Sequence, residues 1–220
     1  MKWFIRHWYD VGGALAALVL LWAWLGQWST VQVILLLNLA VLLIHQFEEY
    51  RFPGGEPWII NEVMQPKGGP ADRYPLNQLN AAFINVAAWL FYLVPVFFPP
   101  AVWVGLAPVV FGFSQFGMHG ILNNRKLRSL YNPGLAAVVL GHIPLGIWYL
   151  VEVYNQQMIS AWDWLFALFY IGFFMGVVML RIGYGVLSPR DSTHPFDPTE
   201  LNRWDRERRL QHAGITPDPH

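Results

Sequence analysis

The chain has 220 residues, of which 55% are hydrophobic and only 13% are charged, and its formal net charge at pH 7 is zero. This composition excludes an ordinary soluble domain, and the balanced charge predicts no nucleic-acid partner. The absence of cysteine excludes disulfides, iron–sulfur clusters and thiol catalysis.

Long apolar stretches fill most of the chain, and a membrane-spanning helix needs roughly 20 mostly apolar residues. Six stretches are long enough, at about 9–27, 31–49, 78–98, 101–122, 133–153 and 161–183. We therefore predict an all-α polytopic membrane protein, with a bundle of about six transmembrane helices over residues 1–184. The Pro/Gly-rich stretch 50–77 is expected to form a polar cytoplasmic loop or lid. Residues 185–220 are expected to form a polar cytoplasmic tail with one short helix, capped by Asp197.

The basic residues predict the orientation, because Lys and Arg stay on the cytoplasmic side of short loops. With six spans, all 14 Lys and Arg residues, Lys67 in the long loop among them, lie on one side of the membrane. The three connections on the opposite side contain none. We therefore expect the N-terminus and the C-terminus to be cytoplasmic.

The second apolar stretch ends in "HQFEEY". Ionisable groups within a bilayer are costly, so those that persist mark candidate functional sites. His45, Glu48 and Glu49 are spaced at i, i+3 and i+4, which puts one imidazole and two carboxylates on one helix face. The mirrored Glu-x-x-His arrangement holds metals in di-metal helix bundles. The three residues therefore predict a divalent metal site, or an acid–base group beside one.

The third and fourth spans carry polar residues in the same cytoplasmic half. Asn80 and Asn85 are candidates to bond neighbouring helices or to orient a substrate. His119 and Asn123 are four residues apart on one helix face and lie near the cytoplasmic end, at the level of His45. We therefore expect the side chains of His45 and His119 to share one pocket, with the three asparagines as catalytic candidates.

The fifth span contains His142, roughly 14 Å from the start of its helix. A lone histidine at that depth is more often a hydrogen-bonded packing residue than a ligand, and we include it as a further metal-ligand candidate. In "YNPG", Asn132 is expected to cap the fifth helix and Pro133 to occupy its first turn.

The stretch "HQFEE" is a literal H-x-x-E-E at the end of an apolar span, and "MHGILNN" and "YNPG" follow it. With these motifs, over roughly residues 35–185, the chain resembles the bacterial membrane proteins that share an HXXEE motif. That family is functionally uncharacterised. The resemblance implies an active or metal site at His45, Glu48 and Glu49, in a protein of the bacterial inner membrane.

A second resemblance is to the glutamate-dependent intramembrane proteases of the CAAX-processing type. It rests on the paired glutamates and on His-x-x-x-Asn at 119–123. Those proteases carry E-E-x-x-x-R and F-x-x-x-H, whereas here Arg51 comes two residues after Glu49, and Gln115 stands in place of the Phe.

The leading functional hypothesis is a metal-dependent integral membrane enzyme. His45, His119, His142 and one of the paired glutamates would hold Zn, Fe or Mn, and the other glutamate would carry a proton. The site would act on an ester, amide or phosphoester of a membrane lipid or lipid-linked substrate, by hydrolysis, or by oxidation if the metal is iron.

Two other functions remain open. A metal-free glutamic protease would use Glu48 or Glu49 to activate water, and His119 with Asn123 to stabilise an oxyanion. The same polar groups could instead serve a small transporter or an accessory subunit of a membrane complex. The polar residues do not continue to the far side of the membrane, which counts against transport.

Overall fold

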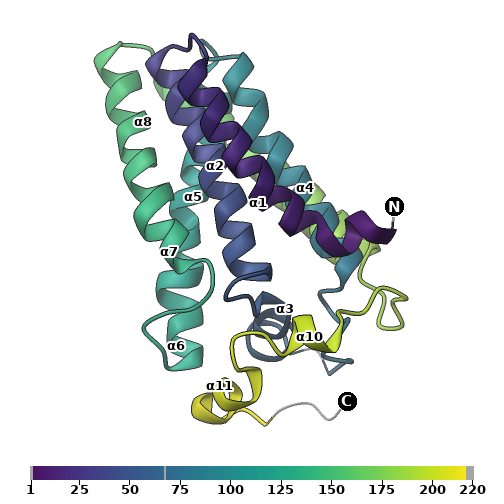
Figure 1. The fold of residues 1–220 in the computed structure, drawn as a ribbon. Helices are drawn as coiled ribbons and strands as arrows, with labels where there is room; N and C mark the ends of the chain where they lie inside the picture. Colours follow the sequence, from purple (N-terminus) through teal and green to yellow (C-terminus); the bar gives the residue numbers. More distant parts are fainter. Residues whose placement is uncertain (1, 67, 217–220) are drawn as a thin grey trace.

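Six long helices form the protein (Figure 1), and the computed structural model describes residues 2–66 and 68–216. Each of the six is long and apolar enough to cross a membrane. Their bounds are Lys2–Leu25, Thr30–Tyr50, Gln78–Phe97, Val102–Leu127, Leu135–Asn155 and Ala161–Val186. The described residues contain no strand. The predicted all-α fold is therefore confirmed, and the chain is a multi-pass membrane protein.

The first two helices are regular, and the other four are composite. The first two are α1 (Lys2–Leu25) and α2 (Thr30–Tyr50). The third joins α4 (Gln78–Leu93) to the short 3-10 helix η2 (Val94–Phe97). The fourth joins α5 (Val102–Gln115), the π-helical η3 (Phe116–Asn123) and α6 (Asn124–Leu127). The fifth joins α7 (Leu135–Ala137), the π-helical η4 (Val138–His142) and α8 (Ile143–Asn155). The last joins α9 (Ala161–Phe173) to the π-helical η5 (Phe174–Val186).

The predicted helix ends agree with the structure to within a few residues, except at the start of α1. That helix begins at Lys2, whereas the apolar run predicted a start near residue 9. Trp8 and Tyr9, which precede most of the apolar run, are buried against the rest of the protein. Their packing extends the helix beyond the residues that hydropathy alone selects, because tertiary contacts override local composition.

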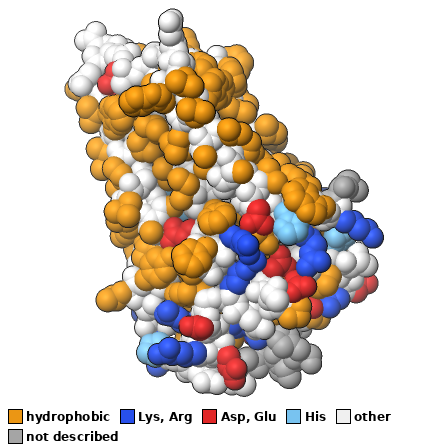
Figure 2. Space-filling model, in the orientation of Figure 1, with side chains coloured by type: hydrophobic (Ala, Val, Ile, Leu, Met, Phe, Trp, Pro, Cys, Tyr) orange, Lys and Arg blue, Asp and Glu red, His pale blue; other side chains and the backbone are white. Residues whose placement is uncertain are grey.

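Charged side chains gather at one end of the bundle, and the surface above them is mainly apolar (Figure 2). Every described Lys and Arg lies at a chain terminus, in the connections that follow α2 and α6, or close to them; Lys67 lies outside the described residues. The connections 26–29, 98–101 and 156–160, at the other end, contain none. We call the charged end the basic end, and the described part of the chain both starts there, at Lys2, and ends there, at Thr216 (Figure 1).

Helix α2 lies at the centre of the bundle and packs against α1, α4 and α8. Of its most apolar stretch, 61% is buried, compared with 11% for the last helix, α9 with η5. The core around α2 includes Leu36, Leu106 and Tyr149, which are almost completely buried. Polar residues near the end of α2 are therefore enclosed by other helices, whereas α9 and η5 turn most of their surface outward.

The connection between α2 and α4 folds back against the basic end of the bundle. It contains α3 (Glu56–Trp58) and the π-helical η1 (Ile59–Met64), and α3 lies below the end of α2 (Figure 1). Trp58 is fully buried. The Asn61 side chain fixes the return of the chain, since it both donates to and accepts from the backbone of Leu76. The stretch 50–77, expected as a polar loop or lid, therefore contains a short buried helix.

The polar tail forms two short helices, α10 (Pro198–Leu201) and α11 (Arg206–Ala213), where the sequence predicted one. The predicted cap is correct, because the Asp197 side chain accepts a backbone N–H from the first turn of α10. The helix stops early because Trp204 and Asp205 both adopt positive φ, which interrupts a helix.

The tail packs against the folded-back connection. The Arg206 guanidinium donates two hydrogen bonds to the Glu62 carboxylate, at 2.6 and 2.7 Å, and both side chains are buried. The indole of Trp58 donates to the backbone carbonyl of Arg203 at 3.1 Å. The tail therefore fixes α3 and η1 in place beneath the helix bundle.

Replacing Arg206 with Met is expected to destabilise the protein by about 3 kcal/mol, because it leaves the buried Glu62 carboxylate without its guanidinium partner. The melting temperature of the detergent-purified protein measures the effect. Arg208→Met is the matched control, since Arg208 lies two residues away and is exposed. Equal melting temperatures for the two variants would show that the pair does not hold the tail.

Candidate metal centre

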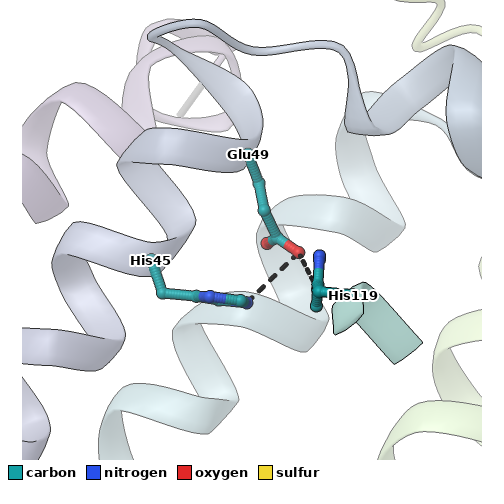
Figure 3. Close-up of side chains that lie close together, drawn as sticks. All are labelled: His45, Glu49 and His119. Atoms are coloured by element: carbon teal, nitrogen blue, oxygen red, sulfur yellow. Dashed lines mark ion pairs between the residues drawn. The ribbon is translucent and has the colours of Figure 1, made fainter. Parts of the chain in front are cut away.

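Two histidines and one glutamate meet in the basic half of the bundle. Helix α2 supplies His45 and Glu49, and η3 supplies His119 (Figure 3). The Glu49 Oε1 atom lies 3.3 Å from the Nε2 atom of each histidine, and the two imidazole centroids are 4.9 Å apart. All three side chains are buried. The prediction that His45 and His119 share a pocket is therefore confirmed.

The Nδ1 atom of each ring faces a fixed oxygen on the other side. His45 Nδ1 is 3.1 Å from the carbonyl oxygen of Gly134, and His119 Nδ1 is 2.8 Å from Asn132 Oδ1. Carbonyl oxygens accept hydrogen bonds and cannot donate them, so each ring carries a proton on Nδ1. In the neutral form, both Nε2 lone pairs are then directed at the position of the Glu49 oxygen.

His142 adds a third imidazole next to this group. Its ring centroid is 5.7 Å from that of His45, and its Nδ1 is 2.8 Å from the side-chain oxygen of Asn38. Its Nε2 is buried and has no hydrogen-bond partner. Asn38 was not among the predicted site residues, although it lies two helical turns before His45 and hence on the same face of α2.

The paired glutamates have different surroundings. Glu48 accepts hydrogen bonds from the backbone N–H groups of Ala136 and Ala137, at 3.2 and 3.0 Å, and from the Tyr131 hydroxyl at 2.7 Å. A carboxylate at a helix N-terminus is stabilised by the free N–H groups there. Burial and the bond to Glu48 also raise the pKa of the Tyr131 phenol. The structure therefore places Glu49, and not Glu48, with the two histidines.

The connection before α7 supports the cluster directly. The sequence predicted Asn132 as a helix cap, but its side chain instead accepts from His119 Nδ1 and donates to the His119 carbonyl at 2.6 Å. The helix starts at Leu135, with Gly134 before it at a φ of 96°. A Cβ atom on Gly134 would lie 2.6 Å from His119 Cε1 and 2.8 Å from His45 Cε1, so only glycine fits.

The three predicted asparagines occupy different positions. Asn80 uses its side chain to cap α4 and to bond the backbone carbonyls of Pro75 and Gly183, which gives it a structural role. Asn85 donates to a carbonyl of its own helix and lines the same cavity as the cluster. Asn123 also lines this cavity, and its buried Oδ1 has no partner. Two of the three therefore border the site.

Glu56, the first residue of α3, is a site residue that the sequence did not predict. It is buried, its Oε2 has no partner, and it lines the cavity beside Glu49 and His119. Burial, reinforced by the negative charge of Glu49, raises the pKa of the Glu56 carboxyl well above its usual range. The stretch "FPGGEP" looked like an ordinary turn, and only the fold shows that it brings a carboxyl group to the cluster.

The cluster opens into a cavity of about 300 Å³. Its polar end contains Glu49, Glu56 and His119, and its other end is lined by apolar side chains of α5 and η5, among them Phe111 and Phe174. Two neutral imidazoles with one carboxylate are a ligand set that Zn, Fe or Mn accepts. The geometry therefore fits a metal centre that faces a small cavity.

Gly134→Ala is expected to cost about 2 kcal/mol or more, because the methyl group would clash with both imidazoles at a backbone φ that favours glycine. Gly214→Ala is the matched control, since Gly214 also has positive φ but has no atom within 4 Å of its added Cβ. Melting temperatures compare the two variants. If Gly134→Ala lowers the melting temperature no more than Gly214→Ala does, the imidazoles have room to move away from the methyl group.

Glu56→Gln is expected to stabilise the metal-free protein at pH 8 more than at pH 5. A carboxyl whose pKa is raised on folding keeps its proton in the folded state, so it costs stability as the pH rises above its unfolded value of about 4.3. The amide carries no such penalty. Melting temperatures at both pH values test this, with the exposed Glu207→Gln as control. An increase in melting temperature over the wild type that is the same at pH 8 and at pH 5 would contradict the prediction.

Comparison with known proteins places the chain in a family. Residues 36–149 match the family described as proteins of unknown function with an HXXEE motif. The match contains both histidines of the cluster, Glu49 and His142. No curated protein and no solved structure matches the chain, and the resemblance to CAAX-processing proteases gains no support. Since the match covers just over half of its residues, the chain belongs to the HXXEE-motif family, whose function is unknown.

Proposed function

We propose that this protein is a metal-dependent membrane enzyme of the hydrolase type, acting on a lipid or lipid-linked substrate. The observation that carries the proposal is the shared arrangement of His45, His119 and His142. Each ring bonds a carbonyl or amide oxygen through Nδ1. Histidines that bind metals commonly donate their other ring N–H to a carboxylate, carbonyl or water, which fixes the tautomer and the ring orientation.

The free nitrogens support the same conclusion. The Nε2 atoms of His45 and His119 converge on Glu49 Oε1, and the buried Nε2 of His142 has no partner in the structure. A buried acceptor without a partner costs free energy, so its presence calls for an explanation. A cation held by Glu49 and by the Nε2 atoms of His45 and His119 would satisfy these two nitrogens, with the Nε2 of His142 outside the group of three ligand atoms.

A purely structural role explains the cluster less well. Ionisable side chains within a membrane-spanning bundle are expensive, and helices can pack without them. Here α2, η3 and η4 each supply one histidine, and the connection before α7 holds two of the rings. Such support fixes ring orientation, which helix packing does not require.

A bound Zn, Fe or Mn ion would polarise a substrate carbonyl or phosphoryl group and activate water against it. The residues of the chain would then divide the remaining work. Glu56 has one free oxygen in the cavity, and burial raises the pKa of its carboxyl, which suits a group that gives a proton to a leaving group. The free Oδ1 of Asn123 can accept a hydrogen bond from the substrate, and Asn85 borders the same space.

The proposal includes a location and an orientation in the membrane. The excess of Lys and Arg at the basic end supports a cytoplasmic position for that end and for both termini. We place the protein in the bacterial inner membrane, with the site in the cytoplasmic half of the bilayer. A substrate would then reach it from the membrane or from the cytoplasmic surface.

Metal analysis of the detergent-purified protein tests the proposal, and the neighbouring glutamates provide matched variants. The wild type and Glu48→Gln are expected to bind one equivalent of Zn, Fe or Mn. The metal content of Glu49→Gln and His119→Ala is expected to be at least tenfold lower, because these substitutions remove atoms that face the proposed ion. Melting temperatures of the four proteins check that the losses are not due to unfolding.

Turnover provides the second half of the test. The metal-loaded wild type is incubated with membrane lipids, and released products are followed by mass spectrometry, with Glu49→Gln as the inactive control. The same samples are also incubated with peptides. A wild-type protein that contains no metal but cleaves peptides would indicate a metal-free protease instead. A wild-type protein that contains no metal, shows no turnover and copurifies with other protein chains would indicate an accessory role in a membrane complex.

A further inference from the structure

The cavity at the candidate metal centre changes character along its length. Near the basic end it is lined by Glu49, Glu56 and His119, and away from that end by Phe111 and Phe174. Its volume of about 300 Å³ is at the lower end of the range for ligand sites. A molecule that fills it must therefore be small or narrow, with one polar end and one apolar end.

The apolar part of the cavity reaches the outer surface between η3 and η5. Met118 on η3 is 36% exposed, and Met175 and Leu180 on η5 are 41% and 60% exposed, although all three line the cavity. Phe174 lies next to Met175 but is only 4% exposed, on the inner side. The cavity thus has a mainly apolar opening in the side of the bundle, with Ser114 as the exposed polar residue of its lining.

This opening lies within two membrane-spanning helices, Val102–Leu127 and Ala161–Val186. Both run towards the basic end, and residues 118 and 175–180 lie in their second halves. In a bilayer, the opening therefore faces the hydrocarbon of the leaflet at the basic end. The molecules that reach it there are the acyl chains of membrane lipids.

The charged residues of the cavity indicate which kind of acyl compound it can bind. Its lining includes Glu49 and Glu56 and contains no Lys or Arg among the described residues. A free fatty acid would bring a carboxylate to this acidic end without a basic side chain to receive it. An acyl chain in ester or amide linkage brings a neutral polar group, and the N–H of an amide can also donate to the unpartnered Oδ1 of Asn123.

We propose that the cavity binds one acyl chain of a membrane lipid, which enters sideways between η3 and η5. The chain lies against Phe111 and Phe174, and its ester or amide group lies beside His45, Glu49 and His119. The chemistry at the polar end rests on the proposed function, whereas binding of the chain does not. The substrate class is therefore an ester- or amide-linked lipid rather than a soluble compound or a peptide.

Photolabelling of the full-length protein in phosphatidylcholine nanodiscs tests the proposal. The probe is a phosphatidylcholine with a diazirine in one acyl chain, and adducts are assigned to single residues by tandem mass spectrometry. Lipid-facing residues such as Leu168, which is 61% exposed, are labelled in any case. Labelling of Phe111 and Phe174, which are 7% and 4% exposed, is expected only if a chain enters the cavity.

Two tryptophan substitutions on η5 provide the matched comparison. Met175→Trp places a larger ring at the opening and is expected to reduce labelling of Phe111 and Phe174 at least fivefold. Val177 is similarly exposed, at 40%, but does not line the cavity, so Val177→Trp is expected to leave it unchanged. Wild-type protein with no label on the two phenylalanines, or equal labelling in the two variants, would overturn the proposal.

Metal content measured on the same samples separates this proposal from the proposed function. Labelled phenylalanines in a protein that binds no metal would support the acyl-chain site and refute the metal enzyme. A metal-loaded protein with unlabelled phenylalanines would refute the acyl-chain site and leave a metal enzyme with another substrate.

Discussion

The site depends on one constraint, which is that the Glu49 carboxylate must be compensated inside an apolar bundle. An unpaired buried charge is far more costly than a paired one. Compensation requires a positive charge at the two Nε2 atoms that lie 3.3 Å away, one on the same helix and one on η3, either as a proton on an imidazole or as the proposed cation. Because η3 belongs to a different span, the constraint fixes how the fourth helix lies against α2. The candidate site and the position of the fourth helix relative to α2 therefore depend on the same three side chains.

The two glutamates of the HXXEE motif have different roles in meeting this constraint. Glu49 faces the histidines, whereas Glu48 binds the N–H groups at the start of α7 and the Tyr131 hydroxyl. By holding the start of α7, Glu48 positions the preceding connection, whose Gly134 carbonyl and Asn132 side chain hold the two rings. The motif thus combines one carboxylate that faces the histidines with one that anchors the start of α7.

Sequence reasoning predicted the six spans and the meeting of His45 with His119, because apolar length and helical spacing are local properties. It could not separate Glu48 from Glu49, since both lie within about 60° of His45 at 100° per residue. It missed Glu56, which reaches the site only because a connection rich in Pro and Gly folds back under α2. It also misread Asn132 as a helix cap, because the contact with His119 forms between residues that only the fold brings together.

The family match clarifies which parts of the site belong together. Residues 36–149 contain His45, Glu49, His119 and His142, and also the connection that holds their rings. The match ends before α9 and η5, the helix that supplies Phe174 and Met175 to the apolar end of the cavity. The polar end is thus built within the matched region, and part of the apolar end outside it. Under the proposed function, the matched region would therefore supply the polar groups that carry the chemistry, and the last helix would share with Phe111 the contacts that select a hydrocarbon chain.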